Sequence, residues 1–220
     1  MFRQSFKVAN SYLAYIPVLA LSGLFIWSDS TRIYALLSAL LSFILYPVIY
    51  GSILETIQKA QRSTWSDLFA KHFARYLGLT LIFLVLVLVV SPLLSGWDYL
   101  GKSIGKVLIG TALQFVGLYI WPLVFLKRRI FNSIYEGFAF LIHKPRASAP
   151  IVPLIFLISI IKLLATLSPV YIFHSTNLML MYGIGYFQNL IIGYVGLIIF
   201  SMAIMRVLEA DGETPHVRET

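Results

Sequence analysis

The chain has 220 residues, of which 59% are hydrophobic and 12% are charged, and its formal net charge at pH 7 is +8. This composition is typical of a polytopic membrane protein and excludes an ordinary water-soluble domain. Because the chain contains no cysteine, disulfides, thiolate nucleophiles and thiolate metal ligands are also excluded.

The apolar segments predict an all-α membrane protein with six transmembrane helices. In chain order, the expected spans are residues 11–27, 33–53, 76–94, 107–125, 151–170 and 184–205. A transmembrane β-barrel is disfavoured, because the segments show no alternation of apolar and polar residues. We therefore expect one polytopic domain over residues 1–206, followed by a polar cytoplasmic tail over residues 207–220.

The basic residues are unevenly divided between the two sides of this predicted bundle. Thirteen lysines and arginines lie in the amino-terminal segment, in the connections after the second and fourth spans, and in the tail. The opposite connections contain Arg32, Lys102 and Lys106. Because cytoplasmic loops are enriched in basic residues, we expect a bacterial cytoplasmic (inner) membrane location with both termini in the cytoplasm. The positive charge then indicates contact with membrane lipids and not with nucleic acid.

The two long cytoplasmic connections carry similar helix signals. Thr64 and Asp67 have the spacing of a capping box, and Ser133 and Glu136 repeat it sixty-nine residues later. Each pair lies beside an apolar helical stripe, formed by Trp65, Leu68, Phe69 and Phe73 in the first connection and by Phe131, Ile134, Phe138, Leu141 and Ile142 in the second. These patterns predict two cytoplasmic amphipathic interfacial helices and a two-unit pseudo-repeat.

Two interpretations of the interfacial helices are open. They either cap the cytoplasmic end of the bundle or form a docking surface for a lipid or a soluble protein. The candidate contact residues on this surface are Trp65, Asp67, Phe69, Arg128, Arg129, Glu136 and Phe138. As cap residues, Asp67 and Glu136 would also accept hydrogen bonds from free backbone N–H groups.

Lys162 is a candidate ligand contact because it is the ionisable residue that lies well inside a predicted span. A charge at that depth is costly unless it is paired or hydrated, so Lys162 is expected either to bind an anionic group or to face a polar cavity with Gln114 or Asn189. Alternatively, the span ends near Ser168 and the Lys162 side chain reaches the outer surface.

The sequence contains no catalytic or cofactor motif. It has no phosphate-binding loop, dinucleotide fingerprint or HExxH sequence, and its histidines do not have the spacing of metal ligands. We therefore expect no catalytic residue, no cofactor and no metal site. A lipid-modifying enzyme would require Asp67, Glu136, His72 and His143 to come together.

Several short motifs resemble a known group of membrane proteins. The sequence PVIYG at residues 47–51 is followed by STWSDLF at 63–69 and by a basic turn at Arg75, and the second half echoes this with YEGFA at 135–139. This layout resembles the bacterial six-helix membrane proteins related to the membrane domain of some glycerophosphodiester phosphodiesterases. The resemblance implies a six-helix membrane fold and no defined activity, since the phosphodiesterase chemistry belongs to a separate domain. The second half departs from the pattern with a basic triplet at 127–129.

Two functions are compatible with these features. The first is a non-catalytic integral inner-membrane protein that acts as a scaffold, an assembly factor or a subunit of a membrane complex, with membrane lipids and a protein bound at the amphipathic helices as partners. The alternative is a transporter of small solutes or lipids, or a lipid-handling membrane protein. Lys162, the pseudo-repeat and the proline and glycine residues within the spans favour this alternative.

Overall fold

The computed structural model describes residues 1–24, 32–58, 63–127, 129–171 and 178–212. These ranges are almost wholly helical and contain no strand. The elements in chain order are α1 (Phe2–Asn10), the short 3-10 helix η1 (Leu13–Tyr15), α2 (Ile16–Leu24), α3 (Arg32–Ile57), α4 (Trp65–Val90), the 3-10 helix η3 (Ser91–Leu94), α5 (Tyr99–Lys127), α6 (Ile130–His143), α7 (Pro145–Ser148), α8 (Val152–Tyr171) and α9 (Leu178–Ala210). The prediction of an all-helical chain is confirmed for this part of the sequence.

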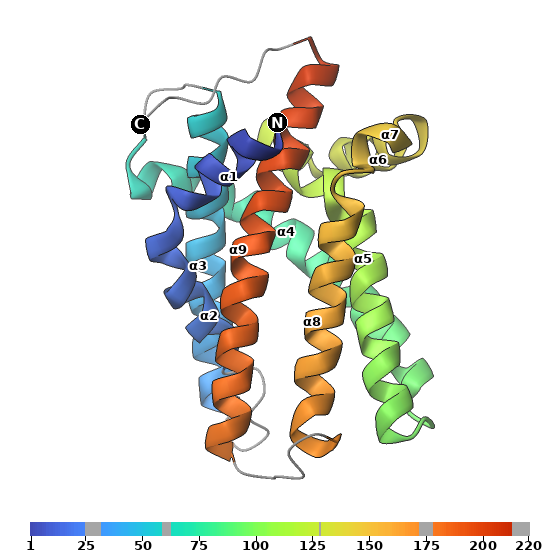
Figure 1. The fold of residues 1–220 in the computed structure, drawn as a ribbon. Coiled ribbons are helices and arrows are strands. Elements are labelled where there is room, and N and C mark those ends of the chain that lie inside the picture. Colours follow the sequence, from blue (N-terminus) through green and yellow to red (C-terminus); the bar gives the residue numbers. More distant parts are fainter. Residues whose placement is uncertain (25–31, 59–62, 128, 172–177, 213–220) are drawn as a thin grey trace.

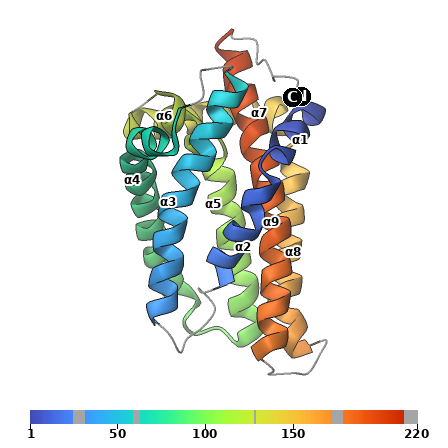
Figure 2. The ribbon, with the colours of Figure 1, turned by 90° about the vertical axis from the view of Figure 1, so that its left-hand side faces the viewer.

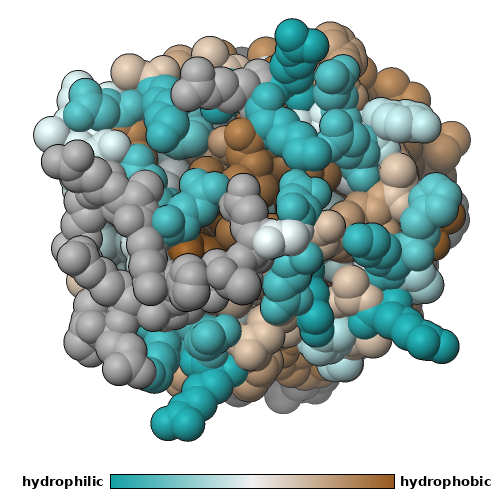
Figure 3. Space-filling model, turned by 90° about the horizontal axis from the view of Figure 1, so that it is seen from above, coloured by the Kyte–Doolittle hydropathy of each residue, from teal (hydrophilic) through white to brown (hydrophobic). Residues whose placement is uncertain are grey.

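The long helices form a bundle with α9 packed against α1, α2, α5 and α8 (Figures 1 and 2). Both α1 and the carboxyl end of α9 lie at the same end of the bundle as α6 and α7, which we call the α6 end. Figure 3 views this end directly, and hydrophilic residues cover much of its surface. Helix α9 continues to Ala210, and Val207 and Leu208 are buried, so the core extends beyond residue 206.

Four helices are long and apolar enough to cross a membrane, which is fewer than the six predicted spans. These are α3, α4, α5 and α9. Helix α8 is shorter in its apolar part, over Val152–Ser168, and α2 has nine residues, with the following residues 25–31 outside the described part of the chain. Because hydrocarbon cannot bind backbone polar groups, long apolar helices of this kind are the expected structure of a membrane-embedded chain.

The prediction of a separate interfacial helix after residue 64 is wrong. Helix α4 runs without a break from Trp65 to Val90, so the amphipathic turns and the apolar span form one helix. The stretch contains no proline, and it contains a single glycine, Gly78. Glycine is common in membrane helices and does not end them. By contrast, α6 is a separate helix that ends at His143, two residues before Pro145, because the residue before a proline disfavours helical geometry.

A close glycine contact occurs within the α3–α4 helix pair, and an equivalent contact occurs within the α5–α6 pair. A Cβ atom built on Gly51 would lie 2.6 Å from His72 Cδ2 and 3.2 Å from Leu68 Cδ2. Counted sixty-nine residues further along, Gly51 corresponds to Ile120 and Leu68 to Gly137. A Cβ atom on Gly137 would lie 2.6 Å from Ile120 Cγ1 and 2.9 Å from the Ile120 backbone nitrogen. The two units thus make the same contact, with the glycine on opposite helices.

Replacing Gly137 by alanine is expected to lower the melting temperature of the purified protein. The new Cβ would press on the backbone of Ile120, which cannot move aside, and overpacking of this kind costs about 1–3 kcal/mol. The matched control is Gly183→Ala in α9, because a Cβ at Gly183 meets no atom within 4 Å and alanine favours the helix. Equal melting temperatures for the two variants in detergent would contradict the close α5–α6 contact.

Candidate functional site: an aromatic cavity and a buried carboxylate cluster

Five helices, α3, α4, α5, α8 and α9, line a cavity of about 500 Å3. Most of its wall is aromatic or aliphatic, and Gln114 and Lys162 provide an amide and a cation. This volume falls within the range of about 300–1,000 Å3 that small-molecule sites occupy. The cavity therefore has the size and the mixed lining of a ligand site.

Aromatic rings from four helices build one side of the cavity. The Tyr46 ring stacks on Tyr76 with centroids 6.0 Å apart, and Tyr76 lies 5.2 Å from the Trp121 ring. The Tyr50 ring stacks on Phe200 at 4.1 Å. Such rings provide large, rigid apolar surface with polar atoms at their edges, and a planar or apolar ligand can pack against them.

Two glycines keep the space open. Gly110 on α5 and Gly196 on α9 line the cavity, and a Cβ atom built on either would meet no atom within 4 Å. The helix backbone itself is therefore part of the wall at these positions. A larger side chain at Gly196 would extend into the cavity without displacing a neighbour's atom at its Cβ position.

Lys162 is the eleventh of the twenty residues of α8, near the middle of the helix. The helix continues through Ser168 to Tyr171, and its apolar part covers Val152–Ser168. Within the described residues, none of the ion pairs includes the Lys162 ammonium. Lys162 therefore lines the cavity from the middle of α8.

Gln114 and Asn189, the two proposed polar neighbours of Lys162, have different surroundings. Gln114 lines the same cavity as Lys162, and its Oε1 atom is buried and has no hydrogen-bond partner in the described part of the chain. The Asn189 amide instead donates to the backbone oxygen of Ala20 at 3.4 Å, and Asn189 is not among the cavity-lining residues. The cavity therefore combines an ammonium group with an amide oxygen that a ligand could hydrogen-bond.

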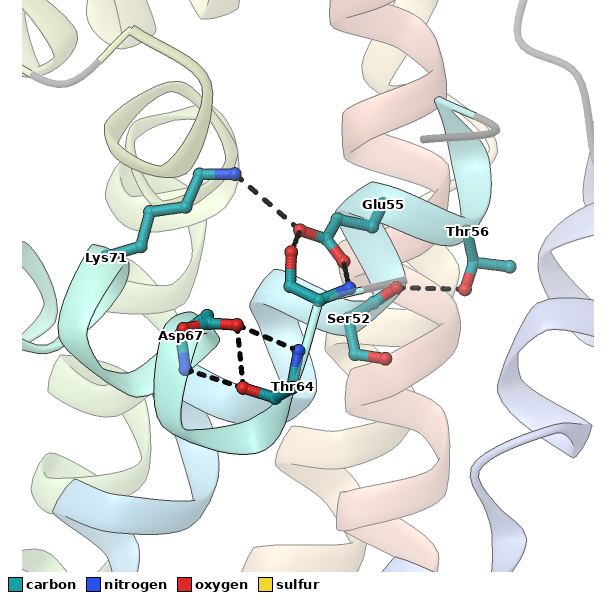
Figure 4. A network of polar contacts seen from close by, with 7 residues as sticks. Ser52, Glu55, Thr56, Thr64, Asp67 and Lys71 are labelled. Carbon is teal, nitrogen blue, oxygen red and sulfur yellow. Dashed lines mark hydrogen bonds and ion pairs between the residues drawn. The ribbon is translucent and has the colours of Figure 1, made fainter. Parts of the chain in front are cut away.

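A second polar feature is the buried carboxylate of Glu55, at the α6 end of α3 (Figure 4). Only 6% of this residue is exposed. Its oxygens accept hydrogen bonds from Ser63 N at 3.0 Å and from Ser63 Oγ at 2.7 Å, and Lys71 Nζ lies 3.6 Å away. This cluster was not predicted, because nothing local in the sequence shows that a carboxylate at the end of a span is buried. Glu55 ties the end of α3 to the segment that leads into α4.

The capping box predicted at Thr64 and Asp67 is confirmed. The Asp67 backbone nitrogen donates to Thr64 Oγ1 at 3.2 Å, and the Thr64 nitrogen donates to Asp67 Oδ2 at 3.3 Å (Figure 4). The Thr64 hydroxyl also donates to Asp67 Oδ2 at 2.7 Å. The local signal therefore fixes the start of α4.

The second capping box, at Ser133 and Glu136, is not formed. Helix α6 begins earlier, at Ile130, and its N-cap residue Arg129 makes no side-chain cap hydrogen bond. Ser133 lies inside the helix and donates to the Arg129 carbonyl at 2.7 Å, while Glu136 forms an ion pair with Lys127 at 2.6 Å. The physical reason is packing: Ile130 lies against a buried apolar cluster shared by α4 and α5, which favours a helix that already includes this residue.

The other candidate contact residues are partly exposed. Trp65 is half exposed beside the Tyr15 ring, Phe69 stacks on Phe73, and Arg129 and Phe138 lie at the surface. Arg128 lies outside the described residues. The predicted α6 stripe is divided. Ile134 and Leu141 pack against the apolar core, while Phe131, Phe138 and Ile142 face outward.

The residues that a lipid-modifying enzyme would require have separate environments. Asp67 bonds to Thr64, Glu136 pairs with Lys127, and the exposed His143 has Nδ1 2.7 Å from the Ala139 carbonyl oxygen. His72 is buried, with its ring 4.9 Å from Phe125. No group of three or more histidine, aspartate or glutamate side chains is placed to hold a metal ion in the ranges the structure describes.

A comparison of the chain with protein-family models, with curated proteins and with solved structures finds no match. The resemblance to the membrane domain of glycerophosphodiester phosphodiesterases therefore stays a prediction.

Proposed function

We propose that the protein binds a small amphiphilic anion in its cavity and belongs to the transporting or lipid-handling class of membrane proteins. The observation that carries this proposal is the presence of Lys162 and the unpartnered Gln114 oxygen in one aromatic cavity. A charge at the middle of a membrane helix costs about 2.5–3.5 kcal/mol, and a bound anion offsets that cost. The apolar part of the ligand then lies on the Tyr46, Tyr76 and Trp121 rings.

On this proposal all six apolar segments cross a bacterial inner membrane, with α2 and α8 completing the spans formed by the longer helices. The α6 end faces the cytoplasm, because the basic residues of the chain are concentrated in the segments that lie there. The hydrophilic surface of this end fits a position outside the hydrocarbon core (Figure 3).

The position of the cavity also supports a transporting or lipid-handling role. Its lining includes residues from both the α3–α4 pair and the α5–α6 pair. Each pair contains its own version of the glycine contact described above. Many transporters bind their substrates near the midplane, at the interface between two repeats. The proposal therefore treats the two pairs as repeats around the site.

Filling the cavity should remove its ligand. We expect an anionic amphiphile to co-purify with the wild-type protein in mild detergent and to be lost in Gly196→Leu, as measured by native mass spectrometry. The matched control is Gly183→Leu, on the same helix, because Gly183 also has open space around its Cβ position but does not line the cavity. If the wild-type protein and Gly196→Leu carry the same bound molecules in the same amounts, the proposal is wrong.

A scaffold or complex-subunit role remains a second candidate because of the exposure of α4. Only 11% of its apolar window is buried within the protein, against 56% for α9. A membrane helix with so little internal contact offers surface to a partner helix as well as to lipid. Stoichiometric co-purification of another membrane protein, lost when α4 carries bulky or polar substitutions, would favour this candidate.

A further inference from the structure

A second pocket, of about 440 Å3, lies between α4 and the start of α6. It is lined by Ala74 and Arg75 of α4 and by residues 129–132, and it shares no lining residue with the aromatic cavity. A Cβ atom built on Gly78 would lie only 2.7 Å from Ile130 Cδ1, so the two helices touch beside the pocket. The position of the α6 amino terminus relative to α4 is therefore well defined.

The polar part of this pocket is positively charged. Arg75 of α4 and Arg129, the N-cap residue of α6, line it together with Asn132, which has a side-chain amide. The first backbone N–H groups of α6 have no acceptor within the helix, and Arg129 makes no side-chain cap. None of the ion pairs within the described residues includes Arg129. Arginine forks and a helix amino terminus together suit the oxygens of a phosphate group.

The apolar part of the pocket continues along α4. Leu81, Val85 and Leu88 follow Ala74 and Gly78 at helical spacing on one face, and their side chains are 48%, 57% and 62% exposed. This face leads from the arginine level toward the carboxyl end of α4. It offers an uncovered apolar track long enough to contact an acyl chain.

Helix α6 presents a second exposed apolar face. Phe131, Tyr135, Phe138 and Ile142 recur at helical spacing and all lie at the surface. Helices with such a face lie at the boundary between headgroups and acyl chains. Phe131 also lines the pocket, so this boundary and the two arginines lie at one level.

We infer that this pocket binds the phosphate of a membrane phospholipid, with Arg75, Arg129 and the α6 amino terminus around the phosphate oxygens and an acyl chain along α4. Free phosphate has the same headgroup chemistry. The lipid is the occupant we favour, because the exposed apolar face continues directly from the pocket. A soluble anion has no apolar part that would contact this face.

The test measures binding of phosphatidylglycerol to the full chain in detergent, by native mass spectrometry and by the lipid-induced rise in melting temperature. Loss of one arginine–phosphate interaction corresponds to roughly a tenfold weaker affinity, so Arg129→Gln is expected to bind about tenfold less tightly. The control, Arg146→Gln, removes an exposed positive charge from α7 at the same end and is expected to keep wild-type affinity. The lipid-free melting temperature of each variant reports on folding.

Three results would overturn the inference. These are unchanged lipid affinity in Arg129→Gln, equal losses in Arg129→Gln and Arg146→Gln, and displacement of the lipid by inorganic phosphate or glycerol 3-phosphate at matched concentration. The last result would assign the pocket to a soluble phosphate. Gly196→Leu is expected to keep phosphatidylglycerol at this pocket, so failure of the cavity proposal and failure of this one are distinguishable.

Discussion

Replacing Lys162 by methionine is expected to abolish binding of the anionic cavity ligand and to raise the melting temperature of the ligand-free protein. Both effects have one cause, because the ammonium group lies in the middle of α8 and none of the described carboxylates pairs with it. Removing a charge from such a position relieves about 2.5–3.5 kcal/mol, and methionine keeps most of the side-chain volume. The measurements are ligand retention by native mass spectrometry and thermal unfolding in detergent.

The opposite signs of the two effects make this prediction specific. If Lys162 were purely structural, its substitution would lower the stability of the protein and would leave ligand retention unchanged. Lys106→Met is the control, because it removes an exposed lysine that does not line the cavity. Lys162→Arg is expected to keep the ligand, with altered affinity because the guanidinium group is larger. Retention of the ligand by Lys162→Met with wild-type affinity would show that the ammonium group is not its anchor.

Replacing Glu55 by alanine is expected to cause a large loss of stability without changing the cavity lining. The substitution leaves the partly buried Ser63 N–H and hydroxyl groups without their acceptor. Hydrogen bonds to charged groups contribute about 1.5–3 kcal/mol each, so we expect a loss of at least that size. Thermal unfolding of the detergent-solubilised protein measures the effect.

Two further variants separate the carboxylate from its ion pair. Glu55→Gln keeps an oxygen acceptor for Ser63 and is expected to lose less stability than Glu55→Ala. Lys71→Met removes a lysine whose side chain is 41% exposed, and exposed ion pairs contribute only about 0–1 kcal/mol. If Glu55→Ala lost no more stability than Lys71→Met, the hydrogen bonds to Ser63 would not be what holds the start of α4.

The two capping signals show how far local sequence reasoning extends. Thr64–Asp67 and Ser133–Glu136 have the same spacing, yet only the first forms a cap. The start of α4 is exposed, so its own backbone and side chains decide where the helix begins. The start of α6 is decided by Ile130, which packs against residues of α4 and α5 that are distant in the sequence. A local motif predicts a boundary only where no tertiary contact competes with it.

The residues that line the cavity likewise divide into those that the sequence signals and those that it does not. The sequence identifies Lys162 and Gln114 as candidates because they are polar residues in apolar segments. The rest of the wall does not, since tyrosines, glycines and a tryptophan are common in membrane helices. Tyr46 and Tyr76 meet only because α3 and α4 pack at one particular rotation. That rotation depends on close approaches such as Gly51 against Leu68, which a single helix does not reveal.

The sequence by itself determined that this chain forms helices apolar enough to cross a membrane, because hydrocarbon requires each apolar segment to satisfy its own backbone hydrogen bonds. It also singled out Lys162 as an unusual charge. Only the tertiary structure decided that Lys162 shares a cavity with Gln114, that Glu55 is buried, and that Arg75 and Arg129 lie at one pocket. The reason is that these features depend on how separate helices are rotated and packed against one another, and no local periodicity encodes that arrangement.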